Sequence, residues 1–283
     1  MLVTNALNFA TKQLKKQKIK SNCIDSEILL SYVLKKKRSN LLINQRDYKI
    51  NTFQLNKFKY LIDQRKKRKP VSLIIGKREF WKYNFFVNKF TLIPRPETEH
   101  IVEISLKNLN LDKKNHILDI GTGSGCIIIS LLKEMKKSSG VAIDICKDAL
   151  KVAKYNAKIH HIENRIKFIK SSVDKFLFGT YDLVVSNPPY INKHKIKYLD
   201  EDVRKYEPIL SLSGGEEGLA VIKNVISKAK KLCKLNGKLI LEIDPIQKIK
   251  VIKILKKSGF QNSKIIRDYN FRERFILSTK IYK

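Results

Sequence analysis

The sequence predicts an α/β fold: a doubly wound, mostly parallel sheet of seven strands, with a small helical domain ahead of it. From residue 116 to residue 243, short apolar strand patterns alternate with amphipathic helical patterns, which is typical of a parallel sheet. The first of these strands runs into a glycine-rich turn, where such sheets bind ligands. Residues 1–75 carry helical patterns instead, so we expect two domains.

Residues 1–75 are expected to form a helical bundle. Apolar residues at helical spacing mark the first helix: Leu2, Ala6, Leu7, Phe9, Ala10 and Leu14. Asp25 is expected to be the N-cap of the second helix, because an apolar face follows it. The third helix begins near Phe53 and ends in the basic run 65–69, before Pro70. We expect that run to be a solvated helix end whose cations complement the carbonyl dipole.

Residues 76–95 are rich in aromatic and β-branched side chains, which predicts a hairpin linking two domains. Pro96 then predicts a helix start, and residues 96–283 form the larger domain. Glu97 and Glu99 lie in the first turn, where they complement the helix dipole or, equally, face a cationic ligand.

The larger domain supplies all seven strands of the expected sheet. They are predicted at residues 116–120, 140–144, 165–170, 181–186, 237–243, 264–268 and 274–279. Helical patterns fill the gaps, notably at 148–159 and 249–257. The last two strands are joined by a short link, which predicts an antiparallel terminal hairpin.

The net charge is extreme. Lys and Arg number 59 against 26 Asp and Glu, a formal charge of +33 over 283 residues. Such a charge attracts nucleic acid, so we expect non-specific RNA affinity. The lysines are spread along the chain rather than gathered in one stripe, which favours a compositional origin for most of the charge.

Cys23, Cys126, Cys146 and Cys233 share no spacing typical of a metal site or a disulfide, and we expect no metal. Cys126 and Cys146 have apolar neighbours, which predicts buried thiols in a reducing compartment. The longest apolar run, 126–132, is too short to cross a bilayer, and the first residues lack a signal-peptide core. We therefore expect a cytoplasmic protein without a membrane partner.

The first strand of the larger domain predicts a nucleoside site. Asp119 lies near its end, and the turn 121–125 (Gly-Thr-Gly-Ser-Gly) lets the backbone approach a ligand closely. The dinucleotide pattern G-x-G-x-x-G would need glycine at Cys126, and no phosphate-binding lysine follows. Asp144 ends the second strand, where a carboxylate accepts ribose hydroxyls. An adenosine-type cofactor is therefore favoured over a dinucleotide.

The strand 181–186 ends abruptly at Asn187, Pro188, Pro189 and Tyr190. Two prolines cannot continue sheet pairing, so Asn187 is held at the carboxyl end of a buried strand. Its amide oxygen, beside backbone carbonyls without a ladder partner, forms a group of acceptors suited to a planar –NH2. A simple strand followed by a Pro-Pro turn is the alternative.

These motifs resemble those of known enzymes. The turn 121–125 with Asp144 resembles the S-adenosylmethionine site of class I methyltransferases, and the run 187–190 resembles the motif of enzymes that methylate amide or adenine –NH2 groups. Residues 25–30, 92–99, 202–208 and 213–219 are similar to the release factor glutamine methyltransferases, the PrmC/HemK family. The likeness covers nearly the whole chain.

The resemblance implies a Rossmann-like methyltransferase fold, the cofactor S-adenosyl-L-methionine, and class 1 peptide chain release factors as partners. The amide (N5) of the glutamine in their Gly-Gly-Gln motif would be methylated, with residues 1–75 recognising the substrate. The catalytic residues it implies are Asn187, Pro188, Pro189 and Tyr190. The cofactor-binding residues it implies are Asp119, Gly121, Thr122, Gly123, Ser124, Gly125, Asp144, Val173 and Asn187.

The sequence departs from the family pattern twice. Asp244 stands where a glycine is usual, and the segment 171–173 lacks an acidic residue, with Asp174 following it. Two alternatives remain: an adenine-N6 methyltransferase, which the positive charge favours, and a non-catalytic RNA-binding protein on a relic fold. The acidic concentration in segment 200–218 is poorly suited to holding phosphates, so we expect that segment to face a protein substrate.

Overall fold

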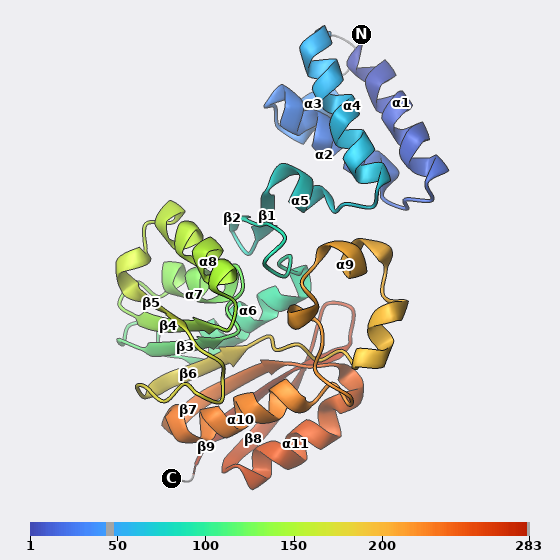
Figure 1. Ribbon diagram of the computed structural model, residues 1–283. Coiled ribbons are helices and arrows are strands. Elements are labelled where there is room, and N and C mark those ends of the chain that lie inside the picture. The colour runs from blue at the N-terminus through green and yellow to red at the C-terminus, as the bar shows by residue number, and fades with distance from the viewer. Residues whose placement is uncertain (44–47, 282–283) are drawn as a thin grey trace. The chain divides into compact units, whose positions relative to one another are not determined.

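The computed structural model describes residues 1–43 and 48–281 (Figure 1). Their contacts divide the chain into two units. The helical unit contains Met1–Lys77 together with Asp200–Tyr206, and the sheet unit contains Arg78–Leu199 and Glu207–Lys283. The chain therefore leaves the sheet unit once to contribute a short helix to the other.

The helical unit packs short helices around one apolar core. Its helices are α1 (Val3–Lys16), α2 (Asn22–Leu34), α3 (Arg38–Ile43), α4 (Thr52–Lys66), α5 (Val71–Ile75) and the distant α9 (Glu201–Tyr206). Leu14, Leu30 and Phe58 are fully buried in this core, as helical periodicity requires. Asn51 begins α4 with a reciprocal capping box to Gln54.

Two expectations for the helical unit were wrong. Helix α2 begins at Asn22, so Asp25 lies within its first turn and not at its N-cap. Arg65 is buried rather than solvated: its Nε donates to Asp25 Oδ2 at 2.7 Å and its Nη1 to Asp202 Oδ2 at 2.6 Å. Spacing alone could not reveal this cluster, because Asp202 comes from α9, 137 residues along the chain.

A two-stranded hairpin, β1 (Lys77–Phe80) and β2 (Tyr83–Phe86), stands at the start of the sheet unit, with only its first residue, Lys77, assigned to the helical unit. Pro96 starts a single 3-10 turn, η1 (Pro96–Thr98), and α6 (Glu99–Asn108) follows it. The helix expected at Pro96 thus begins with a tighter turn. That turn places the side chain of Thr98 beside Asn187 and Glu242.

The large sheet has seven strands within the described residues, in the order β5-β4-β3-β6-β7-β9-β8. They are β3 (His116–Ile120), β4 (Ser139–Asp144), β5 (Ile166–Lys170), β6 (Tyr181–Ser186), β7 (Cys233–Glu242), β8 (Phe260–Arg267) and β9 (Glu273–Lys280). Pairing is parallel from β5 to β7 and antiparallel around β9, so the mostly parallel sheet with its terminal hairpin is confirmed.

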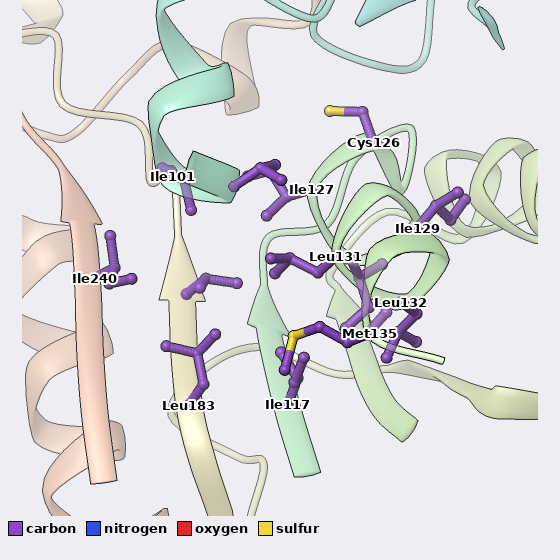
Figure 2. Close-up of a cluster of buried hydrophobic side chains, with 14 of the residues drawn as sticks. Ile101, Ile117, Cys126, Ile127, Ile129, Leu131, Leu132, Met135, Leu183 and Ile240 are labelled. Carbon is purple, nitrogen blue, oxygen red and sulfur yellow. The ribbon is translucent and has the colours of Figure 1, made fainter. Parts of the chain in front are cut away.

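Helices cover both faces of this sheet (Figure 1). Those on one face are α6, α7 (Cys126–Glu134) and α8 (Lys147–Ile159), and those on the other are α10 (Ala220–Leu232) and α11 (Lys248–Lys257). Figure 2 shows the α7 side chains Ile127 and Leu131 near Ile117 and Leu183 of the strands. Alternate strand residues serve opposite cores: Leu183 belongs to the first and Val184 to the second.

Strand order reverses between β3 and β6. The chain passes from β3 outward to β4 and β5, then returns to place β6 on the other side of β3. Open α/β sheets bind ligands at the carboxyl ends of the strands at such a point. The register pairs Asp119 with Val185, so the glycine turn and Asn187 emerge side by side.

Candidate active site

A cavity of about 380 Å³ lies at the carboxyl ends of β3, β4, β5 and β6. Its lining joins the turn 121–124, Asp144, residues 171–174 and residues 186–189. Seven of the predicted cofactor-binding residues therefore line one cavity: Gly121, Thr122, Gly123, Ser124, Asp144, Val173 and Asn187. Asp119 and Gly125 are not among its described lining residues. Ser186 ties the two central strands together there, because its Oγ donates to the Ile120 carbonyl at 2.7 Å.

The glycine turn leaves room for a ligand. Gly121 and Gly123 have φ of +76° and +55°, a region that favours glycine, and a Cβ on either would meet nothing within 4 Å. Gly125 differs, because a Cβ there would lie 2.9 Å from the side chain of Ile129 in α7. Two glycines thus open toward the cavity, and the third permits close helix packing.

Asp119 carries a buried atom without a partner. Its Oδ2 accepts from Thr122 Oγ1 at 2.7 Å, but its Oδ1 has no hydrogen bond among the described residues. Burial raises the pKa of this carboxyl to about 7, against the lowering effect of Thr122. A buried acceptor left open is costly, so this oxygen is suited to a donor brought by a ligand.

Asp144 is held by the backbone around it. Its Oδ2 accepts from the Gly123 amide at 2.9 Å and its Oδ1 from the Cys146 amide at 2.8 Å. Each carboxylate oxygen keeps a second lone pair for hydroxyl donors. Burial raises the pKa of Asp144 despite these bonds. Cys146 is only half-buried, in contrast to the expected buried thiol, whereas Cys126 is buried.

Asn187 is anchored through its amide nitrogen. Its Nδ2 donates to Thr98 Oγ1 at 3.0 Å, and Thr98 Oγ1 donates to Glu242 Oε2 at 2.8 Å. The Oδ1 of Asn187 and the carbonyl of Pro188 accept no hydrogen bond from any described residue. Both residues line the cavity, and neither of these two acceptors is occupied by another described group.

Tyr190 has a different environment from its neighbours. Pro188 and Pro189 line the cavity, whereas Tyr190 is not one of its described lining residues. Its hydroxyl donates to Glu242 Oε1 at 3.2 Å, and its carbonyl accepts from Gln247 Nε2 at 3.0 Å. Burial, and then the charge of Glu242, raise its pKa. Tyr190 is thus held against Glu242, and the catalytic role that the resemblance implies for it stays a prediction.

Glycines in segment 213–219 allow the chain to pass close to the 187–190 run. A Cβ at Gly214 would lie 2.6 Å from the Pro189 carbonyl oxygen, and one at Gly218 would lie 2.2 Å from that of Tyr190. The Gly214 amide also donates to the Ile191 carbonyl at 2.8 Å. Only glycine fits such approaches, so this segment fixes the turn that carries Asn187.

Glu207 pins the segment before η1. This buried carboxylate accepts from the Ile93 amide at 3.1 Å and from Arg95 Nη2 at 2.6 Å. Arg78 Nε in turn donates to the Pro94 carbonyl at 3.1 Å. Pro94 and Arg95 line the cavity, so the acidic group of the 202–208 motif acts inside the protein as a support for the cavity wall.

Other carboxylates of segment 200–218 are paired as well. Asp202 bonds Arg65, Glu216 bonds Lys193, and Glu217 lies 3.4 Å from Lys250. This segment therefore presents less free acidic charge than its sequence indicated. Its expected role in facing a protein substrate stays a prediction.

The two departures from the family pattern have structural counterparts. Asp244 caps the 3-10 turn η5 (Pro245–Gln247), because its Oδ1 accepts from the Ile246 amide at 3.1 Å. The same turn positions Gln247 against the Tyr190 carbonyl. Ser171, Ser172, Val173 and Asp174 all line the cavity, so an acidic residue contributes to its wall despite its later position in the sequence.

Two family models match this chain. The model of the PrmC N-terminal domain matches residues 5–76, and that of the methyltransferase small domain matches residues 100–205. A release factor glutamine methyltransferase of Clostridium acetobutylicum is 36% identical over 285 residues, covering 99% of both chains. One of Buchnera aphidicola is 37% identical, covering 99% of this chain and all of its own.

The chain belongs to the release factor glutamine methyltransferase family. The expected family is thereby confirmed, and with it the class of enzyme, a methyltransferase. A bifunctional methyltransferase of Rickettsia felis is 34% identical over 307 residues, and the match covers 99% of this chain but 58% of that protein.

Solved structures extend the likeness to the fold alone. The hMettl16 catalytic domain in complex with the MAT2A 3′UTR hairpin 6 has a TM-score of 0.58 at 18% identity, covering 70% of this chain and 76% of its own. A methyltransferase from Pyrococcus furiosus has a TM-score of 0.53 at 17% identity, covering 70% and 89%. The predicted methyltransferase-like sheet is therefore confirmed.

Neither a metal site nor a membrane-spanning helix is found among the residues that the structure describes. Within residues 1–43 and 48–281, no group of three or more His, Cys, Asp and Glu side chains is placed to hold a metal ion. In that part of the chain, no helix combines the length and apolar character needed to cross a bilayer.

Sequence reasoning missed the roles of Thr98 and Glu242. Thr98 lies in the segment 92–99 and Glu242 in the predicted strand 237–243, but nothing in their spacing shows that they meet, since 144 positions separate them. One usable signal existed: Glu242 is a charged residue at the carboxyl end of an apolar strand, the same position that marked Asp144 and Asn187.

Proposed function

We propose that this protein transfers a methyl group from S-adenosyl-L-methionine to the side-chain amide nitrogen (N5) of the glutamine in the Gly-Gly-Gln motif of class 1 peptide chain release factors. The observation that carries the proposal is that Asn187 and Pro188 line the cavity at the switch point of the sheet, while Asn187 Oδ1 and the Pro188 carbonyl accept no hydrogen bond from any described residue. A planar –NH2 offers two donors, which matches two acceptors.

The residues of the cavity fit the cofactor. The open space over Gly121 and Gly123 admits a ligand close to the backbone, and Asp144 retains lone pairs for two ribose hydroxyls. Asp119 is buried behind the glycine turn and is not among the described lining residues, but its unpartnered oxygen could accept a hydrogen bond from the amino group of the methionine part if the turn adjusts on binding. Thr122, Ser124 and Val173 complete the surrounding wall. When bound, the cofactor supplies a methyl group activated on a sulfonium.

The protein's contribution is mainly orientation. An amide nitrogen is a weak nucleophile, because its lone pair is delocalised into the carbonyl. Asn187 Oδ1 and the Pro188 carbonyl would hold both N–H bonds, so that the nitrogen lone pair faces the methyl donor. Positioning of this kind supplies up to roughly 7–11 kcal/mol in intramolecular reactions. Transfer would form the N–CH3 bond as the S–CH3 bond of the sulfonium breaks, leaving a thioether. One N–H proton would then pass to water, since the described side-chain partner of Asn187, Thr98, is a hydroxyl and not a strong base.

The test is mass spectrometry of purified class 1 release factor after incubation with the protein and cofactor. We expect a gain of one methyl group, located on the glutamine of the Gly-Gly-Gln motif. A release factor with that glutamine changed to alanine should remain unmodified. RNA and DNA are incubated in parallel, because adenine also presents a flat –NH2. Methylated adenine with unmodified release factor would replace the proposal by the adenine-N6 alternative.

A further inference from the structure

Asn187, Thr98, Glu242 and Tyr190 form one chain of hydrogen bonds that crosses three segments of the sheet unit. Asn187 Nδ2 donates to Thr98, Thr98 donates to one oxygen of Glu242, and Tyr190 donates to the other. Thr98 and Glu242 are both buried. All three are bonds between side chains, so they do not form part of any helix or sheet pairing. Their effect is to fix the orientations of the four side chains.

The chemistry of each group fixes the direction of the chain. An ionised carboxylate only accepts, so Thr98 must give its single hydroxyl proton to Glu242. The Thr98 oxygen then has lone pairs left for Asn187, and only the –NH2 end of the amide can donate to them. The oxygen of the amide must consequently face the cavity. Two buried residues thus determine whether Asn187 presents an acceptor or a donor.

Reversing the direction of these hydrogen bonds would exchange the donor and acceptor groups that Asn187 presents to the cavity. If Glu242 carried a proton, it could donate to Thr98, whose hydroxyl would turn toward Asn187. The amide would then present its oxygen to Thr98 and its –NH2 to the cavity, where it would repel another –NH2. The groups that face Glu242 are Tyr190, Thr98, Arg274 and Glu97. Arg274 favours the ionised carboxylate, while Glu97 opposes it.

We propose that Thr98 and Glu242 are positioning residues that hold the Asn187 amide with its oxygen toward the cavity. An oxygen in that position accepts a hydrogen bond, so it selects a substrate whose methylated group is a hydrogen-bonding –NH2. The catalytic significance rests on the proposed function, but the orientation of the amide does not. The two are therefore tested by separate measurements.

Orientation is measured by NMR on 15N-labelled protein. The side-chain –NH2 signals of Asn187 are identified by their loss in Asn187→Asp. Thr98→Val keeps the shape of residue 98 but removes its hydroxyl, so the Asn187 signals should shift and exchange faster with water. Thr98→Ser keeps the hydroxyl and should restore them. Ser105→Ala is the matched control, because it removes another buried hydroxyl, one that donates to the Ile101 carbonyl within α6. It should leave the Asn187 signals unchanged.

Function is measured by release factor methylation with the same variants. Thr98→Val should lower kcat about tenfold or more, the order expected for losing one hydrogen bond in a reacting complex, with cofactor Kd changed less than about threefold. Thr98→Ser should recover most of the loss. The positioning role would be overturned if Thr98→Val kept the melting temperature of the unmodified protein and its Asn187 signals were also unchanged. Absent methylation by the unmodified protein would overturn the proposed function and leave the NMR result standing.

Discussion

Asp144 and Asn187 follow strands on opposite sides of β3, and each faces the same cavity from its own side. Asp144 is fixed by two backbone amides, while Asn187 is fixed by a hydroxyl. Their expected tasks are separate: one carboxylate for the cofactor and one amide for the group that receives the methyl.

Substitution of these two residues should therefore give opposite defects. Asn187→Ala should abolish turnover while leaving cofactor Kd within several-fold, because it removes an acceptor for the substrate amide. Asp144→Ala should weaken cofactor binding by about one to two orders of magnitude, since a charge-assisted hydrogen bond is worth roughly 1.5–3 kcal/mol. Isothermal titration with the cofactor and methylation kinetics distinguish them. Equal effects of both variants on cofactor Kd would contradict this division.

The ionisation of Glu242 should be visible in the pH dependence. Burial raises the pKa of this carboxyl from 4.5 to about 7, with Thr98, Arg274 and Tyr190 lowering it in part. Because the ionised form sets the orientation of Asn187, kcat should fall as the pH decreases through about 7. Glu242→Gln cannot ionise, so this acid limb should be absent from its profile.

The same carboxyl should affect stability with the opposite sign. The native protein binds the Glu242 proton more tightly than the unfolded chain, so the free energy of unfolding should decrease as pH rises from about 4.5 to 7. Glu242→Gln should lack this decrease. Asp119 is present in both proteins, so the difference between their profiles isolates Glu242. Parallel profiles for the two proteins would show that Glu242 does not titrate in this range.

At the level of elements, most of the sheet unit was predictable, because apolar runs bounded by Gly, Pro and Asn define strands without knowledge of the fold. Strand ends at Ile120, Asp144 and Ser186 were placed correctly for that reason. Strands β7 and β8 begin four residues earlier than predicted. Their first residues are largely polar, so the apolar strand pattern starts only later in the sequence. Residues linked only by tertiary contact, such as Arg65 with Asp202, give no local signal at all.

Helix α4 should depend on Arg65. Arg65→Met would leave the buried Asp25 without its cation, which costs about 3 kcal/mol when a buried pair is broken from one side. Arg38→Met is the matched control, because Arg38 pairs with Glu27 of α2 while half exposed, and such pairs contribute less than about 1 kcal/mol. Hydrogen exchange should show lost protection in α2, α4 and α9 only for the first variant. Equal protection in both would contradict a stabilising role for Arg65.

The whole molecule carries more cations than it can neutralise. Even if every one of the 26 acidic side chains were paired, a charge of +33 would remain. Several carboxylates that the sequence left free are in fact paired, so the unpaired charge is almost entirely positive. Composition could not separate a functional charge from an incidental one, because lysines distributed along the whole chain do not indicate which ligand they would bind.

Binding to single-stranded RNA should therefore be strong at low salt and unselective. With four or more phosphates neutralised, log K against log salt should have a slope of about −3 or steeper. Fluorescence anisotropy with RNAs of unrelated sequence measures it, and the RNAs should remain unmethylated. A slope near zero, or a marked preference for one sequence, would indicate a dedicated RNA site.

Helix α9 belongs to the helical unit, yet it is encoded after β6 of the sheet unit. A ribosome making roughly 5–20 residues per second needs on the order of ten seconds to go from residue 77 to residue 206. Throughout that interval the nascent helical unit lacks Asp202, and Arg65 has only Asp25 as its partner. The amino-terminal unit is thus the first to be started, but it is complete only at residue 206, after β6 has been made. A nascent chain stalled between these points would contain Arg65 without one of its two carboxylate partners.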